Sequence, residues 1–342
     1  MNMEFERKLT IPMEAKEMYP VTMEISETIA KRDIELKKIL DGRDDRLILI
    51  IGPCSADNED SVMDYITRLK GVSDKVKDKI FIIPRIYTNK PRTSGEGYKG
   101  MLHQPNPNEK PDLFKGIIAI RKLHMRAVKE TGFSCADEML YTENHKYLDD
   151  LLGYVAVGAR SVEDQQHRLT ASGIEVPVGM KNPTAGDFNG MLNAIKTAQH
   201  GHSFIYRGWS AHSFGNPYAH AVLRGYSDMH GNFISNYDYE HVAKLAEMYA
   251  EFDLENPAVI IDTNHANSGK DPFKQPGIIK EVLKYRNEHD DLKKLVKGFM
   301  VESYIEDGNQ KVGEGIYGKS ITDACLGWEK TEKMIFEMAD II

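Results

Sequence analysis

The stretch LILIIG at residues 47–52 decides the fold of this chain. It consists of leucine and isoleucine up to its final glycine, and no polar residue alternates with the apolar ones. Such a run predicts a strand of a parallel sheet, in which both faces are buried. Seven further short runs predict strands in the same way: IFIIPRI (80–86), FSCAD (133–137), YVAVGA (154–159), VPVGMK (176–181), SFIYR (203–207), AVIIDT (258–263) and KGFMVE (297–302).

Longer stretches with helical periodicity separate these runs, for example SVMDYITRLKGV (61–72) and DYEHVAKLAEMYAEF (238–252). Eight strand-helix alternations favour an α/β fold of the (β/α)8 TIM-barrel type over an open doubly wound sheet. No GxGxxG motif opens a helix after the first strand, so a dinucleotide-binding fold is not favoured. The run 210–236, rich in Gly, Asn, Ser and His, predicts a long excursion after the sixth strand.

Two segments make up the predicted domain organisation, residues 1–45 and residues 46–342. The first is an N-terminal extension that contains the helical stretch SETIAKRDIELKKIL (26–40), and the second is the barrel. We expect the extension either to cover the N-terminal face of the barrel or to serve as a subunit contact or effector region.

Composition limits the class of protein. With 41% hydrophobic residues in a chain of 342, the sequence can bury a large core. Its net charge of -8 argues against a general nucleic-acid surface. No apolar stretch approaches the roughly 20 residues of a membrane span, and MNMEFERKLT lacks the apolar segment of a secretory signal. The three scattered cysteines fit a reducing compartment, so we expect a cytoplasmic protein without nucleic-acid or membrane partners.

Four residues of metal-ligand type follow or lie beyond the predicted strands. Cys54 follows LILIIGP, His265 follows AVIIDTN, Glu302 ends KGFMVE, and Asp323 lies in KSITDAC. Polar residues at strand ends converge at one rim of a barrel. A thiolate, an imidazole and two carboxylates suit a divalent transition metal. From residue types alone, a buried cysteine, a capping histidine and two solvated carboxylates remain an equal alternative.

Cations are expected at the same rim. They come from strand ends and from the loop that follows the second strand: Arg85, Lys90, Arg92, Lys99, Arg160, Lys181 and Arg224, with Thr93 beside them. Arginine offers a planar fork for phosphate or carboxylate and lysine a compact charge. So many like charges on one face would repel one another unless anions lay between them. The pattern therefore predicts a site for phosphorylated or carboxylated small molecules, against the alternative of a solvated basic loop.

An ordered set of short motifs carries a family resemblance. They are GPCS (52–55), KPRT (90–93), YKG (98–100), GAR (158–160), HR (167–168), KN (181–182), LRG (223–225), HANS (265–268), VES (301–303) and YGKSITDAC (317–325). In order and in spacing, from about Asp44 to Trp328, they resemble the class I microbial 3-deoxy-D-arabino-heptulosonate 7-phosphate synthases. Such enzymes are transferases of aromatic amino acid biosynthesis, and members of this type are often feedback-regulated.

The resemblance implies a condensation of phosphoenolpyruvate with D-erythrose 4-phosphate and water, the first step of the shikimate pathway. It implies one divalent metal ion (Mn, Fe, Co or Zn) on Cys54, His265, Glu302 and Asp323. Phosphoenolpyruvate would be held by Arg85, Lys99, Arg160, Lys181, Arg224 and the backbone around Gly158 and Ala159. Erythrose 4-phosphate would be bound by Lys90, Arg92 and Thr93, and Glu138 would lie near the attacking water. Lys90, Glu138, Cys54 and His265 are the implied catalytic groups.

Other functions remain open at this level. Lys181 at a strand end could form the Schiff base of a class I aldolase. A 3-deoxy-octulosonate 8-phosphate synthase is a neighbouring alternative, although KPRT and HANS fit the heptulosonate family better. A barrel that binds an effector or a partner without catalysis is the non-enzymatic alternative.

Regulation and assembly are expected from the resemblance alone. Family likeness implies a homodimer or homotetramer. One extra residue, with Glu96, stands between Thr93 and Tyr98 relative to the family pattern, and we expect it to leave the paired cations in place. The N-terminal segment and the excursion are shorter than in well-known feedback-regulated members, so we expect weak or absent inhibition by aromatic amino acids, although Ser172 is retained.

Overall fold

The computed structural model describes residues 2–92 and 95–342. Within these residues, eight parallel strands form one sheet in the order β2-β1-β12-β11-β8-β5-β4-β3. The edge strands β2 and β3 meet through a parallel bridge between Arg85 and Ala136, so the sheet is nearly closed into a barrel. The predicted α/β barrel is therefore confirmed. Its strands are β1 (Leu47–Gly52), β2 (Ile80–Pro84), β3 (Cys135–Glu138), β4 (Leu152–Val157), β5 (Val178–Lys181), β8 (Ala219–Leu223), β11 (Val259–Asp262) and β12 (Val296–Glu302).

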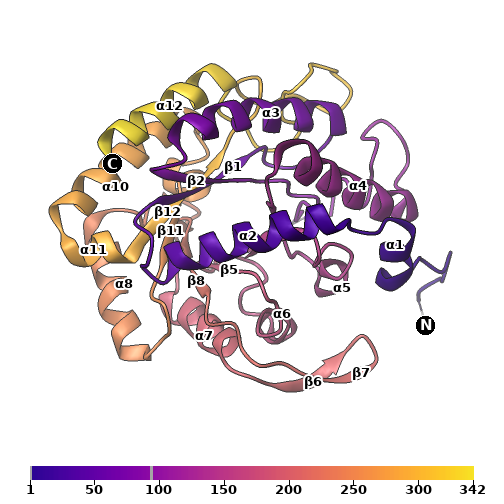
Figure 1. Ribbon diagram of the computed structural model, residues 1–342, viewed down its shortest axis with the longest axis horizontal. Helices are drawn as coiled ribbons and strands as arrows, with labels where there is room; N and C mark the ends of the chain where they lie inside the picture. The colour runs from indigo at the N-terminus through magenta and orange to yellow at the C-terminus, as the bar shows by residue number, and fades with distance from the viewer. Residues whose placement is uncertain (1, 93–94) are drawn as a thin grey trace.

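Helices surround this sheet as an outer layer (Figure 1). They are α3 (Glu59–Val76), α4 (Leu113–Thr131), α5 (Thr142–His145), α6 (Gln165–Ala171), α7 (Phe188–Gln199), α8 (Tyr239–Phe252), α9 (His265–Ser268), α10 (Gln275–Glu288), α11 (Asp290–Leu295) and α12 (Trp328–Ile341), with a 3-10 turn at Pro272–Lys274. Short polar side chains begin several of them. Asn58 accepts a hydrogen bond from the Ser61 amide at the start of α3, and Asp112 accepts one from the Lys115 amide at the start of α4. Among the helices described, none is long and apolar enough to cross a membrane.

Side chains of β1 alternate between two apolar clusters. Leu47, Leu49 and Ile51 pack in the cluster shared with the outer helices, whereas Ile48 and Ile50 pack inside the barrel. Every residue of the strand is buried because both faces are covered. This arrangement explains why LILIIG lacks polar alternation.

The N-terminal segment forms α1 (Pro12–Met18) and α2 (Met23–Leu40), and α2 lies across the barrel (Figure 1). Leu36, Ile39 and Leu40 of α2 are buried in the cluster that fills the barrel interior. Arg32 of the same helix donates a hydrogen bond to the Ile82 carbonyl of β2. The helix thus closes the end of the barrel opposite the rim on which the strands end.

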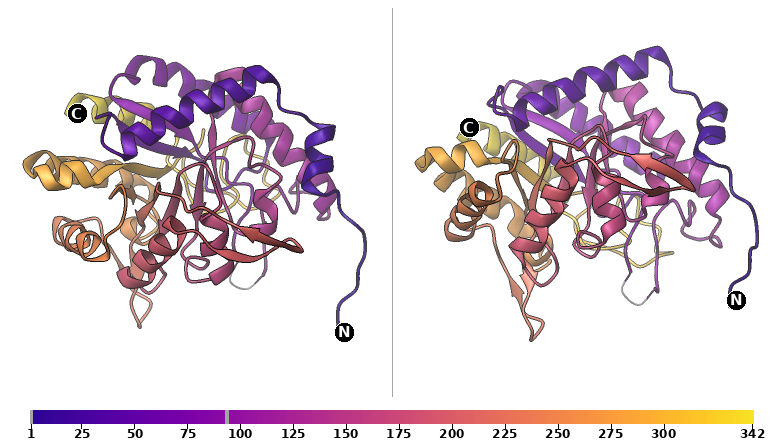
Figure 2. Two further views of the ribbon diagram at one scale, coloured as in Figure 1. Left: turned by 60° about the horizontal axis from the view of Figure 1, so that its bottom comes forward. Right: turned by 90° about the horizontal axis from the view of Figure 1, so that it is seen from below.

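The prediction that SFIYR forms the sixth barrel strand was wrong. Ser203–Tyr206 is β6, which pairs antiparallel with β7 (Trp209–His212) in a hairpin outside the barrel. Its side chains alternate between exposed and half-buried, as in a ribbon with one free face. Figure 2 shows the hairpin projecting from the body of the molecule.

The sixth barrel strand is β8, AHAVL, which is buried throughout and lies between β5 and β11. The excursion is consequently divided into two parts. The β6–β7 hairpin precedes this strand, and a second hairpin of β9 (Tyr226–Ser227) and β10 (Phe233–Ile234) follows it.

Candidate active site

The carboxyl ends of the strands carry the polar residues of the site. Arg85 directly follows β2, Glu138 ends β3, Lys181 ends β5, and Glu302 ends β12. Because parallel strands end at one rim, these side chains meet there. Arg85, Glu138 and Lys181 line a pocket of about 440 Å³ or a smaller adjoining one of about 60 Å³, whereas Glu302 is buried beside them and lines neither. Among the predicted residues, the first pocket is lined by Cys54, Arg85, Lys90, Arg92, Glu138, Arg160, Arg224, His265 and Asp323. The second is lined by Glu138, Gly158, Ala159, Arg160, Lys181, Arg224 and His265.

One predicted residue, Lys99, is placed differently, and another, Thr93, cannot be compared. Lys99 has an exposed side chain and does not line either pocket as described, although its carbonyl accepts a hydrogen bond from the Lys90 amide. Thr93 lies outside the described residues.

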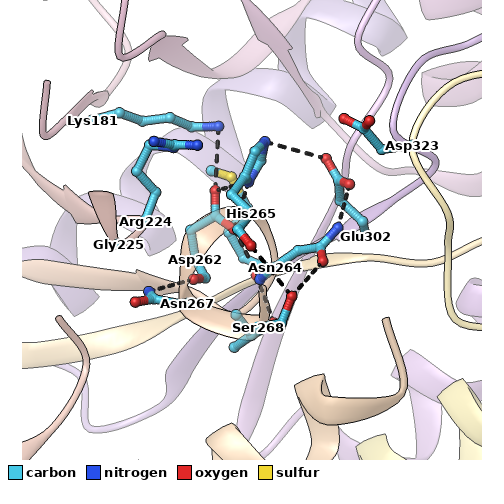
Figure 3. Close-up of polar contacts among 12 residues, drawn as sticks. Lys181, Arg224, Gly225, Asp262, Asn264, His265, Asn267, Ser268, Glu302 and Asp323 are labelled. Atoms are coloured by element: carbon cyan, nitrogen blue, oxygen red, sulfur yellow. Dashed lines mark hydrogen bonds and ion pairs between the residues drawn. The ribbon is translucent and has the colours of Figure 1, made fainter. Parts of the chain in front are cut away.

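Three of the four predicted metal ligands form a compact cluster. One ligand atom each from Cys54, Glu302 and Asp323 lies within 4.8 Å of the others. His265 Nε2 lies 3.7 Å from Glu302 Oε1, so the imidazole faces the same space (Figure 3). Sulfur, nitrogen and carboxylate oxygen donors around one point suit a divalent transition metal.

A cationic side chain already points into this cluster. Lys90 Nζ is 2.7 Å from Cys54 Sγ and 2.7 Å from Asp323 Oδ2. Burial lowers the pKa of Lys90, but the surrounding acidic groups, Cys54, Asp323 and Glu302, outweigh burial and raise the pKa overall. The donor set therefore favours positive charge at this point, which is the property that a metal site requires.

Burial and the negative charge of Glu302 raise the pKa of the Cys54 thiol to about 11. A coordinating metal ion deprotonates a thiol outright. The cysteine is thus protonated in the metal-free protein and suited to become a thiolate ligand on metal binding.

Glu302 is held ionised although its side chain is fully buried. Burial opposes ionisation of Glu302, but the charges of Arg85, His265 and Lys90 outweigh burial and lower its pKa. Arg85 Nη2 donates to Oε1 at 2.7 Å and Asn264 Nδ2 donates to Oε2 at 2.5 Å. These bonds fix the orientation of the carboxylate in the cluster.

Two nitrogens of the Arg85 guanidinium remain available as hydrogen-bond donors in this arrangement. Its Nε and Nη1 are buried and have no hydrogen-bond partner among the described residues. The guanidinium lies 3.8 Å from the centre of the Tyr87 ring, which stabilises it by a cation–π contact. Buried donors without a partner cost free energy, so this arginine is suited to bind an anion in the pocket.

Asp262, the last residue of β11, organises the other side of the site and was not predicted. Its carboxylate lies 3.3 Å from Lys181 Nζ and 2.9 Å from His265 Nδ1 (Figure 3). Burial opposes ionisation, but the charges of His265 and Lys181 hold the pKa of Asp262 well below its usual range. The carboxylate orients the imidazole so that Nε2 faces Glu302, as second-layer carboxylates do for histidine ligands. The signal was present, because Asp262 ends an apolar run as Glu302 does.

His265 itself has an unusual backbone conformation. Its φ is 52°, in the left-handed region that residues other than glycine seldom adopt. It begins the short helix α9 directly after the β11 rim, and its carbonyl accepts a hydrogen bond from the Lys270 amide. Such a conformation persists where surrounding contacts hold it, here the bond from the ring to Asp262.

Glu138 lies between the cations of the second pocket. Its Oε2 is 4.0 Å from Lys181 Nζ, and a Cβ added at Gly158 would lie 2.6 Å from its Oε1. The absence of a side chain at Gly158 therefore lets β4 approach the carboxylate. Arg160 and Arg224 line the same pocket, and burial lowers the pKa of Arg224. A negative ligand there would relieve the mutual repulsion of the cations.

Comparison with known proteins identifies the family of the chain. Residues 18–335 match the model of the DAHP synthetase I family. A Phe-sensitive phospho-2-dehydro-3-deoxyheptonate aldolase of Escherichia coli strain K12 is 36% identical, covering 98% of this chain and 95% of the relative. A phospho-2-dehydro-3-deoxyheptonate aldolase of Haemophilus influenzae is also 36% identical, covering 97% of this chain and 91% of the relative.

The fold is shared over the same length. The structure of a phospho-2-dehydro-3-deoxyheptonate aldolase from Francisella tularensis SCHU S4 superposes with a TM-score of 0.92 at 32% identity, covering 100% of this chain and 98% of that one. A family match over most of the chain, relatives above 30% identity and a common barrel all agree. The chain therefore belongs to the DAHP synthetase I family.

Proposed function

We propose that this chain is a 3-deoxy-7-phosphoheptulonate synthase, which condenses phosphoenolpyruvate with D-erythrose 4-phosphate and water and releases phosphate. The observation that carries the proposal is the convergence of the Cys54, His265, Glu302 and Asp323 donors with a rim of cations. The substrates are two polyanions that repel each other. Holding them in contact is mainly a task of positioning and electrostatic stabilisation, for which this rim is suited.

Separate groups of cations would bind the two substrates. Phosphoenolpyruvate would be bound by Arg85, Arg160, Lys181 and Arg224, with the backbone of Gly158 and Ala159. Lys90 and Arg92, with Thr93, would bind erythrose 4-phosphate. Lys90 also connects the erythrose 4-phosphate region to the metal donors, because its ammonium touches Cys54 and Asp323.

In the reaction, C3 of phosphoenolpyruvate attacks the aldehyde carbon and water adds to C2. The resulting phosphohemiketal then loses inorganic phosphate. Lys90 would donate the proton that the new alkoxide needs, and Glu138 would accept a proton from the attacking water. A divalent ion on Cys54, His265, Glu302 and Asp323 would supply Lewis-acid polarisation of the aldehyde. Mn, Fe, Co and Zn all tolerate this donor set.

A Schiff-base aldolase is disfavoured by the contacts of Lys181. Its amine is buried and forms an ion pair with Asp262 at 3.3 Å, and a charged ammonium is not a nucleophile. A barrel that binds ligands without turnover is the second alternative, and the intact donor set argues against it. We further propose a homodimer or homotetramer in the cytoplasm. The cysteines at positions 54, 135 and 325 are free, which fits a reducing compartment.

Phosphate release distinguishes these functions. The purified protein is supplied with each substrate alone and with both, before and after chelation and after restoration of Mn²⁺. We expect release that needs both substrates and the metal. Activity that survives chelation, together with a covalent lysine adduct trapped by borohydride, would instead show a Schiff base. Substrate binding without phosphate release would show a non-catalytic barrel.

A further inference from the structure

The Asp137 side chain joins two parts of the site at the seam of the barrel. The seam lies between β2 and β3, where the Ile86 amide donates to the Ala136 carbonyl at 2.9 Å. In a regular parallel ladder the next amide on that side, Thr88, would bond to the backbone of the neighbouring strand. Here the Thr88 amide instead donates to Asp137 Oδ1 at 2.9 Å. The Asp137 carboxylate thus replaces a backbone carbonyl as the hydrogen-bond acceptor at the point where strand pairing ends.

Two more hydrogen bonds complete the junction. Thr88 Oγ1 donates to Asp137 Oδ2 at 2.5 Å, and the Glu138 amide donates to Oδ1 at 2.7 Å. One carboxylate therefore holds both Thr88, which lies two residues before Lys90, and the backbone of Glu138. Further along, the Lys90 amide donates to the Lys99 carbonyl at 3.0 Å, so the loop is tied at its base.

The Asp137 carboxylate is costly in this position. The residue is only 4% exposed, and burial raises its pKa to about 7. A basic side chain lies beside it, that of His124, whose Nε2 is 3.9 Å from Oδ2. Burial lowers the pKa of His124 to about 3, so that ring is neutral near pH 7 and does not offset the charge. A buried carboxylate whose charge is offset mainly by hydrogen bonds reduces the stability of the fold, so its presence at this point indicates a role in the site.

We propose that Asp137 is a positioning residue of the reaction, acting through Thr88. It fixes Lys90, which would protonate the alkoxide, relative to Glu138, which would handle the attacking water. The proposal rests on the proposed function, because the position of Lys90 relative to Glu138 matters only if both groups act on one pair of substrates. Binding of erythrose 4-phosphate should depend on the junction more than binding of phosphoenolpyruvate does, since three of the four cations proposed for phosphoenolpyruvate, Arg160, Lys181 and Arg224, lie at the ends of other strands.

The test removes one hydroxyl group rather than the carboxylate, because Asp137→Ala would leave two buried amides unpaired and could unfold the protein. Thr88→Val deletes the bond to Oδ2 at nearly constant volume, and Thr88→Ser restores a hydroxyl. Thr131→Val is the matched control, since Thr131 Oγ1 is a buried hydroxyl bonded to the Ala127 carbonyl of α4, away from the site. Steady-state kinetics for both substrates and hydrogen exchange of peptides spanning residues 86–102 are measured for each variant.

A hydrogen bond to a carboxylate typically contributes enough for Thr88→Val to lower kcat/KM for erythrose 4-phosphate by about tenfold or more. We expect little change in KM for phosphoenolpyruvate, recovery in Thr88→Ser, and faster exchange confined to residues 86–102. Normal kinetics in Thr88→Val, or equal losses for both substrates together with a general increase in exchange, would overturn the proposal. If the wild-type protein releases no phosphate, the proposed function fails, whereas unchanged exchange in Thr88→Val would refute the junction independently.

Discussion

Asp262→Asn removes one negative charge from the centre of the site and keeps the shape of the side chain. The lost charge lies 3.3 Å from Lys181 Nζ. At an effective dielectric constant of ~20 this attraction is about 5 kcal/mol before desolvation is counted, and broken buried pairs cost about 3–5 kcal/mol in practice. Glu138 Oε2, 4.0 Å from the same ammonium, compensates in part. We therefore expect the free energy of unfolding to fall by about 3 kcal/mol.

The same change should weaken metal binding. Asp262 orients His265 through Nδ1 at 2.9 Å, and loss of such a partner typically lowers metal affinity about 10- to 100-fold. Urea unfolding of the metal-free protein measures the first effect, and calorimetric titration with Mn²⁺ measures the second. Asp57→Asn is the matched control, because Asp57 is also buried but its pKa is raised by burial rather than lowered by cations. The reasoning would be refuted if Asp262→Asn bound Mn²⁺ as tightly as the wild type, or if both variants changed stability alike.

Four other outcomes are expected. Cys54→Ser should retain the fold in circular dichroism but lose most activity at limiting metal, because a hydroxyl is a poorer ligand than a thiolate; near wild-type activity would remove Cys54 from the metal site. Arg160→Ala should raise KM for phosphoenolpyruvate more than KM for erythrose 4-phosphate, and equal effects would contradict our division of the pocket. For Asp57, whose pKa is raised from 3.8 to about 6 by burial, the wild type should lose stability relative to Asp57→Asn as pH rises from about 4 to about 6. If we are wrong, urea unfolding across that range would show a constant difference in the free energy of unfolding between the two proteins. Phenylalanine, tyrosine and tryptophan at millimolar concentration should each leave activity almost unchanged, and saturable inhibition at micromolar concentration would disprove the expectation.

Most of the barrel could be predicted because burial on both faces leaves a local signal. Runs such as LILIIG and AVIIDT are apolar without alternation, and the barrel strands β1 and β11 lie within them. SFIYR carries a similar signal but forms an exposed hairpin, because its pairing with Trp209–His212 satisfies the backbone without the barrel. AHAVL was missed because His220 interrupts it. The structure shows that this histidine is buried and bonded to Tyr154 Oη, a partner distant in sequence.

The site could be predicted as a set of residues but not as a network. Position at strand ends was enough to place Cys54, His265 and Glu302 on one rim. The contact of Lys90 with both Cys54 and Asp323 could not be predicted, because it joins three loops at long range. Asp262 was overlooked for a different reason. The role of a single carboxylate at the end of a strand can be recognised only from its partners, here Lys181 and His265, which the fold brings to it.

The closure of the barrel by α2 has a consequence for synthesis of the chain. Strand β1 pairs with β12, so Ile48 lies beside Gly298, and the enclosed space into which Leu36, Ile39 and Leu40 fit is complete only when almost the whole chain has left the ribosome. Until then these three side chains, which are made first, have no finished cavity to occupy. Pairing between segments so distant in sequence is slow, and apolar surface exposed meanwhile favours aggregation. We therefore expect the N-terminal helix to remain undocked during most of translation, and a chain shortened before β12 should leave that helix undocked.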